Sequence, residues 1–176
     1  GVVGDDSEGE KIYELLKEKG IEYSGVCTES KRHTSLKRRI VSGTQQLLRI
    51  DREAVHAIDA TVLGNIEAML EEKIRACDIV IISDYCEGLF SDSLVLDIKA
   101  EAKRWDKKIF VDSKNRHFLH FKDVYLIKPN KEEAESFAGE RFTETYSNLE
   151  SIGKKLTALF NANIVITLGK DGTALF

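Results

Sequence analysis

The chain has 176 residues, of which 42% are hydrophobic and 32% charged, and its formal net charge is −4. This length and composition predict one soluble globular domain and exclude a disordered tail. The acidic balance argues against a domain built to bind nucleic acid or an anionic membrane surface, and no apolar run is long enough to cross a bilayer. Three cysteines without metal-ligand spacing are typical of reduced thiols, so we expect a cytoplasmic protein.

The first third of the sequence predicts a helix followed by a hairpin. N-capping residue types stand at 5–7, apolar residues follow at helical spacing, and Gly20 supplies the left-handed stop of a helix. From about 23 to 51 the pattern changes to short β-type runs. Within it, 36–42 and 45–51 are separated by Gly-Thr and predict a β-hairpin, whose alternating polar and apolar residues suit a small exposed sheet.

From residue 59 onward, helical patterns alternate with apolar strands. The expected strands are 78–83, 108–112, 124–128 and 163–168, and helices are expected near 63–77, 91–102, 130–137 and 152–160. Strands that are apolar throughout and alternate with amphipathic helices are typical of a parallel sheet covered on both faces. We therefore predict an α/β fold with a doubly wound parallel sheet and a small projecting β appendage.

The carboxyl ends of parallel strands are where ligands bind in such sheets, so the residues there are candidate site residues. The four expected strands end in Ser83-Asp84-Tyr85, Asp112-Ser113-Lys114, Lys128-Pro129-Asn130 and Thr167-Leu168-Gly169. Any one of these residues alone is more often a helix cap or loop residue, but four polar ends at one edge favour a site. Asp84 and Asp112 offer carboxylates for sugar hydroxyls or a metal, and Lys114 offers a cation for phosphate.

Two motifs at the last strand ends have both a structural and a functional interpretation. Asn130 and Glu133 have the spacing of a helix capping box, and on the same helical turn Asn130 could hold a phosphate oxygen and Glu133 a magnesium-bound water. Thr167, Gly169 and Gly172 belong to a turn that ordinary turn chemistry explains, but its glycines would also let a base or a phosphate approach the backbone. Spacing alone decides neither case.

Cations are concentrated at the start of the expected hairpin. Five lie within nine residues: Lys31, Arg32, Lys37, Arg38 and Arg39. No aromatic residues interleave with them, as they do in single-stranded nucleic-acid sites. In a strand, Lys37 and Arg39 share one face and Arg38 takes the other. That pair is equally consistent with a lid that clamps a phosphorylated ligand and with a charged edge strand that resists aggregation.

Taken in order, these motifs resemble one family, the ribokinase-like (pfkB) sugar kinases. The resemblance spans nearly the whole chain and rests on Gly1-Val-Val-Gly4-Asp5-Asp6, Thr34-x-x-Lys37-x-Arg39, Gln45-Gln46-Leu47-Leu48-Arg49-Ile50-Asp51, Ser83-Asp84-Tyr85-x-x-Gly88, Val111-Asp112-x-Lys114, Pro129-Asn130-x-x-Glu133 and Thr167-x-Gly169-x-x-Gly172. Within the family, the run 45–51 and the Ser-Asp-Tyr motif look most like the heptose-7-phosphate kinase domain, which often precedes an adenylyltransferase domain and supplies heptose for lipopolysaccharide.

The resemblance implies a kinase that moves the γ-phosphoryl group of ATP to a sugar hydroxyl with Mg²⁺. For the heptose branch, the acceptor is the anomeric hydroxyl of D-glycero-D-manno-heptose 7-phosphate. The implied site residues are Lys37 and Arg39 on the lid over the sugar phosphate, Asp84, Asp112 and Lys114 in or near the sugar and phosphate crevice, and Asn130, Glu133, Thr167, Gly169 and Gly172 around the nucleotide, with Glu133 toward the metal. Lids of this family often mediate dimers, so a homodimer through the hairpin is implied as well.

The resemblance also indicates that residues 1–176 are the central part of one kinase domain, with the lid at about 23–51. The family's Gly-rich sugar-binding motif and first strand are expected before Gly1. Its Gly-Ala-Gly-Asp motif, which supplies the anion-hole amides and the catalytic aspartate, is expected after Phe176, so no catalytic residue is assigned within the chain. Because phosphoryl transfer depends on that base and anion hole, we expect the chain by itself to be inactive or nearly so.

Three residues depart from the pattern of the heptose branch. Glu87 stands where the branch usually has Lys, Ser113 where it often has Pro, and Lys128 where it has Thr. The reversed charge at 87 bears on the identity of the sugar more than on the reaction. Two other functions stay open: a non-catalytic ligand-binding or regulatory domain that kept the crevice, and an interaction module whose hairpin pairs with another subunit.

Overall fold

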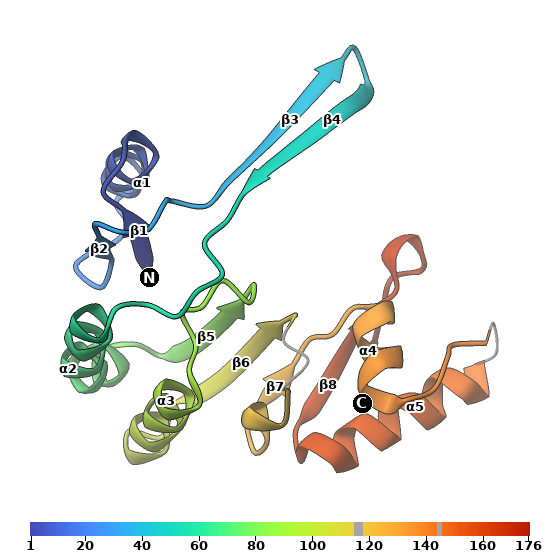
Figure 1. The fold of residues 1–176 in the computed structure, drawn as a ribbon. Coiled ribbons are helices and arrows are strands. Elements are labelled where there is room, and N and C mark those ends of the chain that lie inside the picture. Colours follow the sequence, from blue (N-terminus) through green and yellow to red (C-terminus); the bar gives the residue numbers. More distant parts are fainter. Residues whose placement is uncertain (115–117, 144–145) are drawn as a thin grey trace. The chain divides into compact units, whose positions relative to one another are not determined.

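The computed structural model describes residues 1–114, 118–143 and 146–176 (Figure 1). These residues form two compact units. The first comprises residues 1–69 and 87–89, and the second comprises residues 70–86 and 90–176. Helix α2 (Ala60–Ala76) begins in the first unit and ends in the second. Across the described residues, no helix combines the length and the apolar character that crossing a membrane requires.

The first unit begins with a parallel strand pair and one helix. Strands β1 (Val2–Gly4) and β2 (Cys27–Glu29) pair in parallel, and α1 (Ser7–Glu18) connects them. Asp6 is the N-cap, and its Oδ1 accepts a hydrogen bond from the Gly9 amide at 2.9 Å. Its other oxygen accepts one from the Thr34 amide at 3.0 Å, and the hydrogen bonds to Thr34 are the main cause that lowers the pKa of Asp6 to about 2. The predicted cap therefore also ties α1 to the segment that leads into the hairpin.

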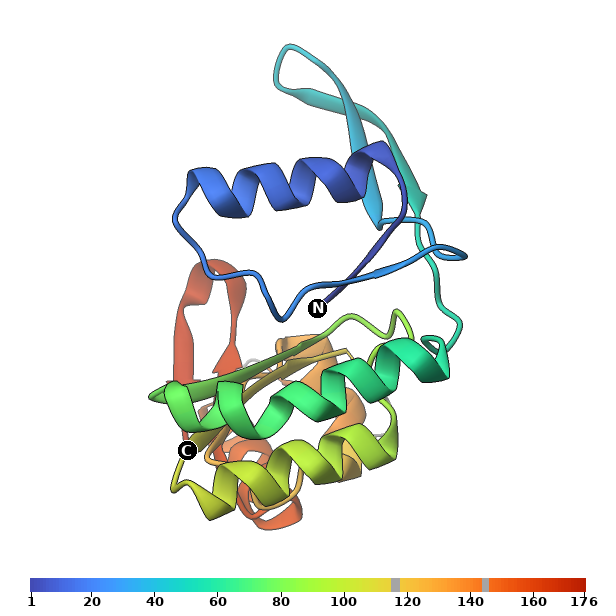
Figure 2. The same ribbon diagram turned by 90° about the vertical axis from the view of Figure 1, so that its left-hand side faces the viewer.

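The predicted hairpin is present in the same unit. Strands β3 (Leu36–Ser42) and β4 (Gln45–Arg52) pair antiparallel, with Gly43 at φ 58° in the turn. In Figures 1 and 2 they form a two-stranded arm that extends away from α1. All residues of the arm beyond Lys37 are exposed on both faces. β2 lies within 23–51 but pairs with β1, so the hairpin itself occupies only 36–52.

The second unit contains the predicted mostly parallel sheet, in the order β5-β6-β7-β8-β9. β5 to β8 are parallel, and β9 pairs antiparallel with β8. The strands are β5 (Ile79–Asp84), β6 (Lys108–Ser113), β7 (Leu126–Ile127), β8 (Asn163–Thr167) and β9 (Thr173–Leu175), and the helices are α3 (Asp92–Arg104), α4 (Lys131–Ala138) and α5 (Tyr146–Phe160), with 3₁₀ turns at Phe118–Phe121 and Gly169–Asp171. The α/β fold class expected from the sequence is confirmed.

A row of four side chains crosses this sheet and forms its core. Strand register aligns Ile82, Val111, Ile127 and Ile164, and none of them is more than 3% exposed. Helix α3 packs on β6, while α4 and α5 pack on β8 and on each other. The buried face of α3 carries Leu94, Val95, Ile98 and Ala102, at the helical spacing seen in the sequence. Removing this apolar surface from water is the main stabilising contribution to the unit.

Strand β5 differs from the expectation of strands covered on both faces. Its Ile79 and Ile81 are 45% and 67% exposed, although Ile82 beside them is buried. Ile79 and Ile81 share one face of the strand and Ile82 takes the other, and among the described residues β5 pairs with β6 alone, so it is an edge strand. The expectation is therefore wrong for β5 in this chain, because alternate residues of a strand point to opposite faces.

Candidate functional site

Asp84 is the last residue of β5 and is only 4% exposed. Its Oδ1 accepts a hydrogen bond from the Cys86 amide at 2.8 Å, and its Oδ2 accepts one from the Ser113 hydroxyl at 3.1 Å. Ser113 is the register partner of Asp84 on β6. The carboxylate thus holds the turn after β5, in which Cys86 has a left-handed φ of 62°, and joins the ends of two neighbouring strands.

Asp112 precedes Ser113 in β6 and therefore projects from the opposite face of the sheet, and Lys114 follows directly after the strand. The Asp112 carboxylate pairs with the Lys128 ammonium at 3.0 Å, and both side chains are about 40% exposed. The Lys114 ammonium lies 4.6 Å from the ring centroid of Tyr85. The carboxyl ends of β5, β6 and β7 thus present one carboxylate, two ammonium groups and an aromatic ring to solvent, a set that suits a polyhydroxylated, anionic ligand.

Asn130 and Glu133 form a complete capping box at the start of α4. The Asn130 side chain accepts from the Glu133 amide at 2.9 Å, and the Glu133 Oε2 accepts from the Asn130 amide at 2.8 Å. The structural interpretation of this motif is therefore confirmed. It does not exclude the functional one, because the second carboxylate oxygen of Glu133 is not used by the box and could hold a metal-bound water. No group of three or more His, Cys, Asp or Glu suited to a metal ion occurs among the described residues.

Thr167 and Asn130 are brought together by the sheet. They form a parallel β-bridge, and the Thr167 amide donates to the Pro129 carbonyl at 3.0 Å. After Leu168, Gly169 (φ 64°) and Gly172 (φ 91°) enclose a short turn closed by the Leu168 amide on the Gly172 carbonyl at 2.8 Å. A methyl group added at either glycine would meet nothing within 4 Å, so the space beside the turn is open to a flat ligand.

Lys37 and Arg39 lie on the hairpin, in the first unit, and share one face as predicted. The Lys37 ammonium pairs with the Glu53 carboxylate at 2.9 Å and with the Glu87 carboxylate at 3.4 Å. The hydrogen bond to Glu53 is the main cause that raises the pKa of Lys37. Lys37 is therefore held by two carboxylates, whereas the site residues of the second unit are held by Ser113, Lys128 and the capping box.

The three departures from the heptose-branch pattern all contact candidate site residues. Glu87 pairs with Lys37, Ser113 donates to Asp84, and Lys128 pairs with Asp112. The Ser35 hydroxyl also donates a hydrogen bond to the Glu87 carboxylate. Sequence comparison alone could single these positions out but could not show what they touch.

Sequence reasoning missed the role of Arg32, which it grouped with the surface cations. Its guanidinium is buried and donates to the Glu29 carboxylate at 2.9 Å. It also donates to three backbone carbonyls, those of Ala54, His56 and Glu87, at 2.6 to 2.9 Å. Arg32 thus fastens together the segments on either side of the hairpin and the segment that carries Glu87.

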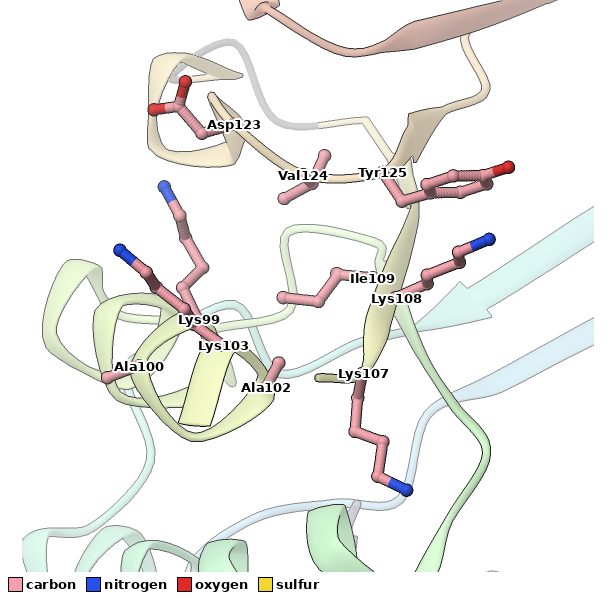
Figure 3. A pocket seen from close by; sticks show the side chains of 10 residues that line it. All are labelled: Lys99, Ala100, Ala102, Lys103, Lys107, Lys108, Ile109, Asp123, Val124 and Tyr125. Carbon is pink, nitrogen blue, oxygen red and sulfur yellow. The ribbon is translucent and has the colours of Figure 1, made fainter. Parts of the chain in front are cut away.

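A cavity of about 450 Å³ lies elsewhere in the second unit (Figure 3). It is lined by the last turns of α3, the start of β6 and the segment 123–125 that precedes β7, at the amino-terminal end of the parallel strands. In Figure 3, Lys99 and Lys103 extend from α3 toward the segment that carries Asp123, while Lys107 and Lys108 point away from Ile109. The candidate residues at the carboxyl ends do not line this cavity.

Comparison with protein families decides which family has this arrangement. The sequence pattern of the family described as "pfkB family carbohydrate kinase" matches residues 1–176 of the chain. The chain belongs to this family. Relatives named bifunctional protein HldE match the chain over its whole length, as the resemblance to the heptose branch predicted. The relative from Desulfatibacillum aliphaticivorans is 35% identical over 100% of the chain and 36% of its own length, and that from Helicobacter pylori J99 is 34% identical over 99% and 38%.

Two solved kinase structures have a similar fold. The tetrameric inhibited form of phosphofructokinase-2 from Escherichia coli matches with a TM-score of 0.75 and 18% identity, over 99% of this chain and 57% of that one. Arabidopsis thaliana ribokinase, complexed with ribose and ATP, matches with a TM-score of 0.72 and 19% identity, over 100% and 56%. The chain thus spans rather more than half of these kinases and about a third of the HldE relatives.

Proposed function

We propose that this chain is the central part of an ATP-dependent carbohydrate kinase whose acceptor is D-glycero-D-manno-heptose 7-phosphate. The observation that carries the proposal is the polar edge of the sheet, where the family's motifs stand at the carboxyl ends of β5, β6 and β8 and at the start of α4. Membership of the pfkB family supports the reaction type, and the HldE relatives support the acceptor. Each proposed role is consistent with the contacts described above.

In the proposed reaction, the anomeric hydroxyl oxygen attacks the γ-phosphorus of ATP, the bond from that phosphorus to the β–γ bridging oxygen breaks, and ADP leaves. The hydroxyl proton passes to a general base, and no residue of this chain is assigned that role. Lys114 and the Asp112–Lys128 pair would position the acceptor and its charge. Asn130, Thr167, Gly169 and Gly172 would hold the nucleotide.

Glu133 is the residue proposed to face Mg²⁺, through a coordinated water. When bound, the ion neutralises charge on the transferring phosphoryl group. Glu133 itself keeps α4 capped with one oxygen and offers the other to the water, and the cap fixes its rotamer before any ligand arrives. The face of the hairpin that carries Lys37 and Arg39 would lie over the phosphate of the sugar.

The experiment is a kinase screen of the full-length gene product, followed by coupled ADP release, with heptose 7-phosphate, fructose phosphates and unphosphorylated sugars. We expect the highest kcat/KM with heptose 7-phosphate. A protein of residues 1–176 alone is the matched control and should show no turnover. Absence of sugar-dependent ADP release from the full-length protein would refute the kinase and favour a ligand-binding domain, whereas normal turnover by residues 1–176 would refute the expected inactivity.

We also propose that the hairpin mediates a homodimer. Arg38 and the apolar residues Ile40, Leu48 and Ile50 share the face opposite Lys37, and these three apolar side chains are 42 to 51% exposed. Exposed apolar side chains on a two-stranded arm are costly unless another surface covers them. Sedimentation velocity should show a dimer that Ile40→Glu with Ile50→Glu converts to a monomer. An unchanged sedimentation coefficient would count against the proposal.

A further inference from the structure

Arg49 lies on β4 directly opposite Arg39 on β3. Strand register also pairs Lys37 with Asp51. Because directly opposed residues of an antiparallel pair share a face, Lys37, Arg39, Arg49 and Asp51 project from the same side of the hairpin. The run 45–51 contributed to the family resemblance, but no role has been given to its arginine.

A bulge in the hairpin produces this arrangement. The register shifts between Ile40 and Val41, because Ile40 pairs with Leu48 while Val41 pairs with Gln46, and Leu47 is extra. Without the shift, counting outward from the turn would place Arg49 opposite Arg38, on the apolar face. A one-residue slip exchanges the two faces of a strand, so the bulge is what brings Arg49 to the face of Arg39.

Of the three cations on this face, Lys37 is the one that pairs with two carboxylates. Its side chain is 30% exposed, and its ammonium group pairs with the carboxylates of Glu53 and Glu87. Arg39, by contrast, is exposed, and among the contacts of the described residues it has no ion pair or hydrogen bond. A phosphate that approached this face would have to displace two ion-paired carboxylates from Lys37, whereas Arg39 has no ion-paired carboxylate to displace and feels the Asp51 charge only at longer range.

The Asp51 carboxylate orients the Arg49 guanidinium group toward binding a phosphate. Its Nε and Nη2 donate to the two carboxylate oxygens at 2.8 and 2.6 Å, and this fork fixes the plane of the guanidinium group. Two of its five N–H donors are used in this way, so the Nη1 edge stays available, and the side chain is 45% exposed. Two guanidinium groups directly opposite each other repel, and a dianion bound between them would relieve that repulsion.

We propose that Arg49, oriented by Asp51, forms with Arg39 the phosphate-binding pair of the hairpin, and that Lys37 instead fastens the base of the arm. The ligand is a phosphate monoester dianion. That this phosphate belongs to a sugar rests on the proposed function. Charge-assisted bidentate hydrogen bonds favour arginine over lysine for such an anion.

The test is isothermal titration of the full-length protein with inorganic phosphate at constant ionic strength. Arg49→Gln and Arg39→Gln should each weaken binding by about tenfold or more, since each removes charge-assisted hydrogen bonds. Asp51→Asn should weaken it less, because the guanidinium remains but is no longer oriented. The matched control is Arg38→Gln, because Arg38 is a cation on β3 that projects from the other face of the hairpin. This variant should bind phosphate with the affinity of wild type. Equal affinities for Arg49→Gln and Arg38→Gln, or no phosphate binding by wild type, would overturn the proposal.

Two further titrations identify the source of the phosphate. If the anion is part of the acceptor, Arg49→Gln should weaken binding of the sugar phosphate and raise its KM with little change in kcat, while ATP binding stays unchanged. Loss of ATP binding instead would overturn the assignment to a sugar. If no sugar is phosphorylated but phosphate binding still depends on Arg49 and not on Arg38, the proposed function fails and the phosphate pair stands.

Discussion

Replacing Arg32 by methionine tests whether its buried guanidinium holds the base of the hairpin. The substitution keeps most of the side-chain volume but removes the arginine partner of Glu29, a residue that is only 6% exposed, and leaves its carboxylate with the exposed His56 ring at 4.0 Å. It also removes the donor to the carbonyls of Ala54, His56 and Glu87. Removing one partner of a buried ion pair costs about 3–5 kcal/mol, and the orphaned carbonyls act in the same direction. An exposed pair contributes at most about 1 kcal/mol.

The measurement is the free energy of unfolding in urea, followed by far-UV circular dichroism, together with hydrogen exchange. The matched control is Lys154→Met, which breaks the Glu150 pair at a lysine side chain that is 72% exposed and should change stability by less than about 1 kcal/mol. Arg32→Met should lose about 3–5 kcal/mol and release exchange protection around residues 29, 54–58 and 87–88. Adding Glu29→Met should recover part of the loss, because the unpaired carboxylate is then gone.

Two results would refute this reasoning. A loss for Arg32→Met no larger than that for Lys154→Met would mean that the buried network does not stabilise the arm. A double variant that is less stable than Arg32→Met would mean that Glu29 stabilises the unit by contacts other than this ion pair.

Three further predictions follow from single contacts. Asp6→Asn should lower the melting temperature at neutral pH. The difference in melting temperature from wild type should narrow as pH falls from about 4 to about 2, because the pKa of Asp6 is lower in the folded state than in the unfolded state. A difference that stays constant over this range would contradict the prediction. Gly88→Ala should lower the melting temperature far more than Gly139→Ala does. Both glycines have a positive φ, but only at Gly88 would an added methyl group lie 1.9 Å from the His56 carbonyl oxygen. Equal losses of melting temperature would refute the close approach. Asn130→Ala should cost about 1 kcal/mol by removing the cap and should raise the KM for ATP with little effect on that for the sugar; an unchanged KM would leave the cap as its only role.

Local sequence signals identified most of the secondary structure because each depends on residues a few positions apart. The cap at Asp6 and the box at Asn130 and Glu133 need partners no more than three residues away, and both are present. The apolar strands predicted from their composition carry the aligned core row of Ile82, Val111 and their neighbours. The expectation for β5 was wrong because composition records how apolar a strand is but not whether both of its faces are covered.

The candidate site was predictable to the extent that strand ends were predictable. Parallel strands place their carboxyl ends at one edge, so Asp84 and Asp112 could be assigned there from the sequence. Their contacts could not be predicted: the buried Asp84 accepts a hydrogen bond from the Ser113 hydroxyl, and Asp112 forms an ion pair with Lys128. Ser113 ends the strand beside that of Asp84, and Lys128 follows the strand beside that of Asp112, so no local pattern of residues signals either contact.

The sequence by itself determined the element order, the helix caps, the family motifs and the fact that Lys37 and Arg39 share a face, because these depend on the periodicity of a single strand or helix. Only the tertiary structure decided that Lys37 is held by Glu87, which lies 50 residues away, and that Arg32 is buried among the segments around the hairpin. It also decided, through one bulge, that Arg49 faces the same side as Arg39. Partner choice over such separations depends on packing and strand register, which no local pattern of residues specifies.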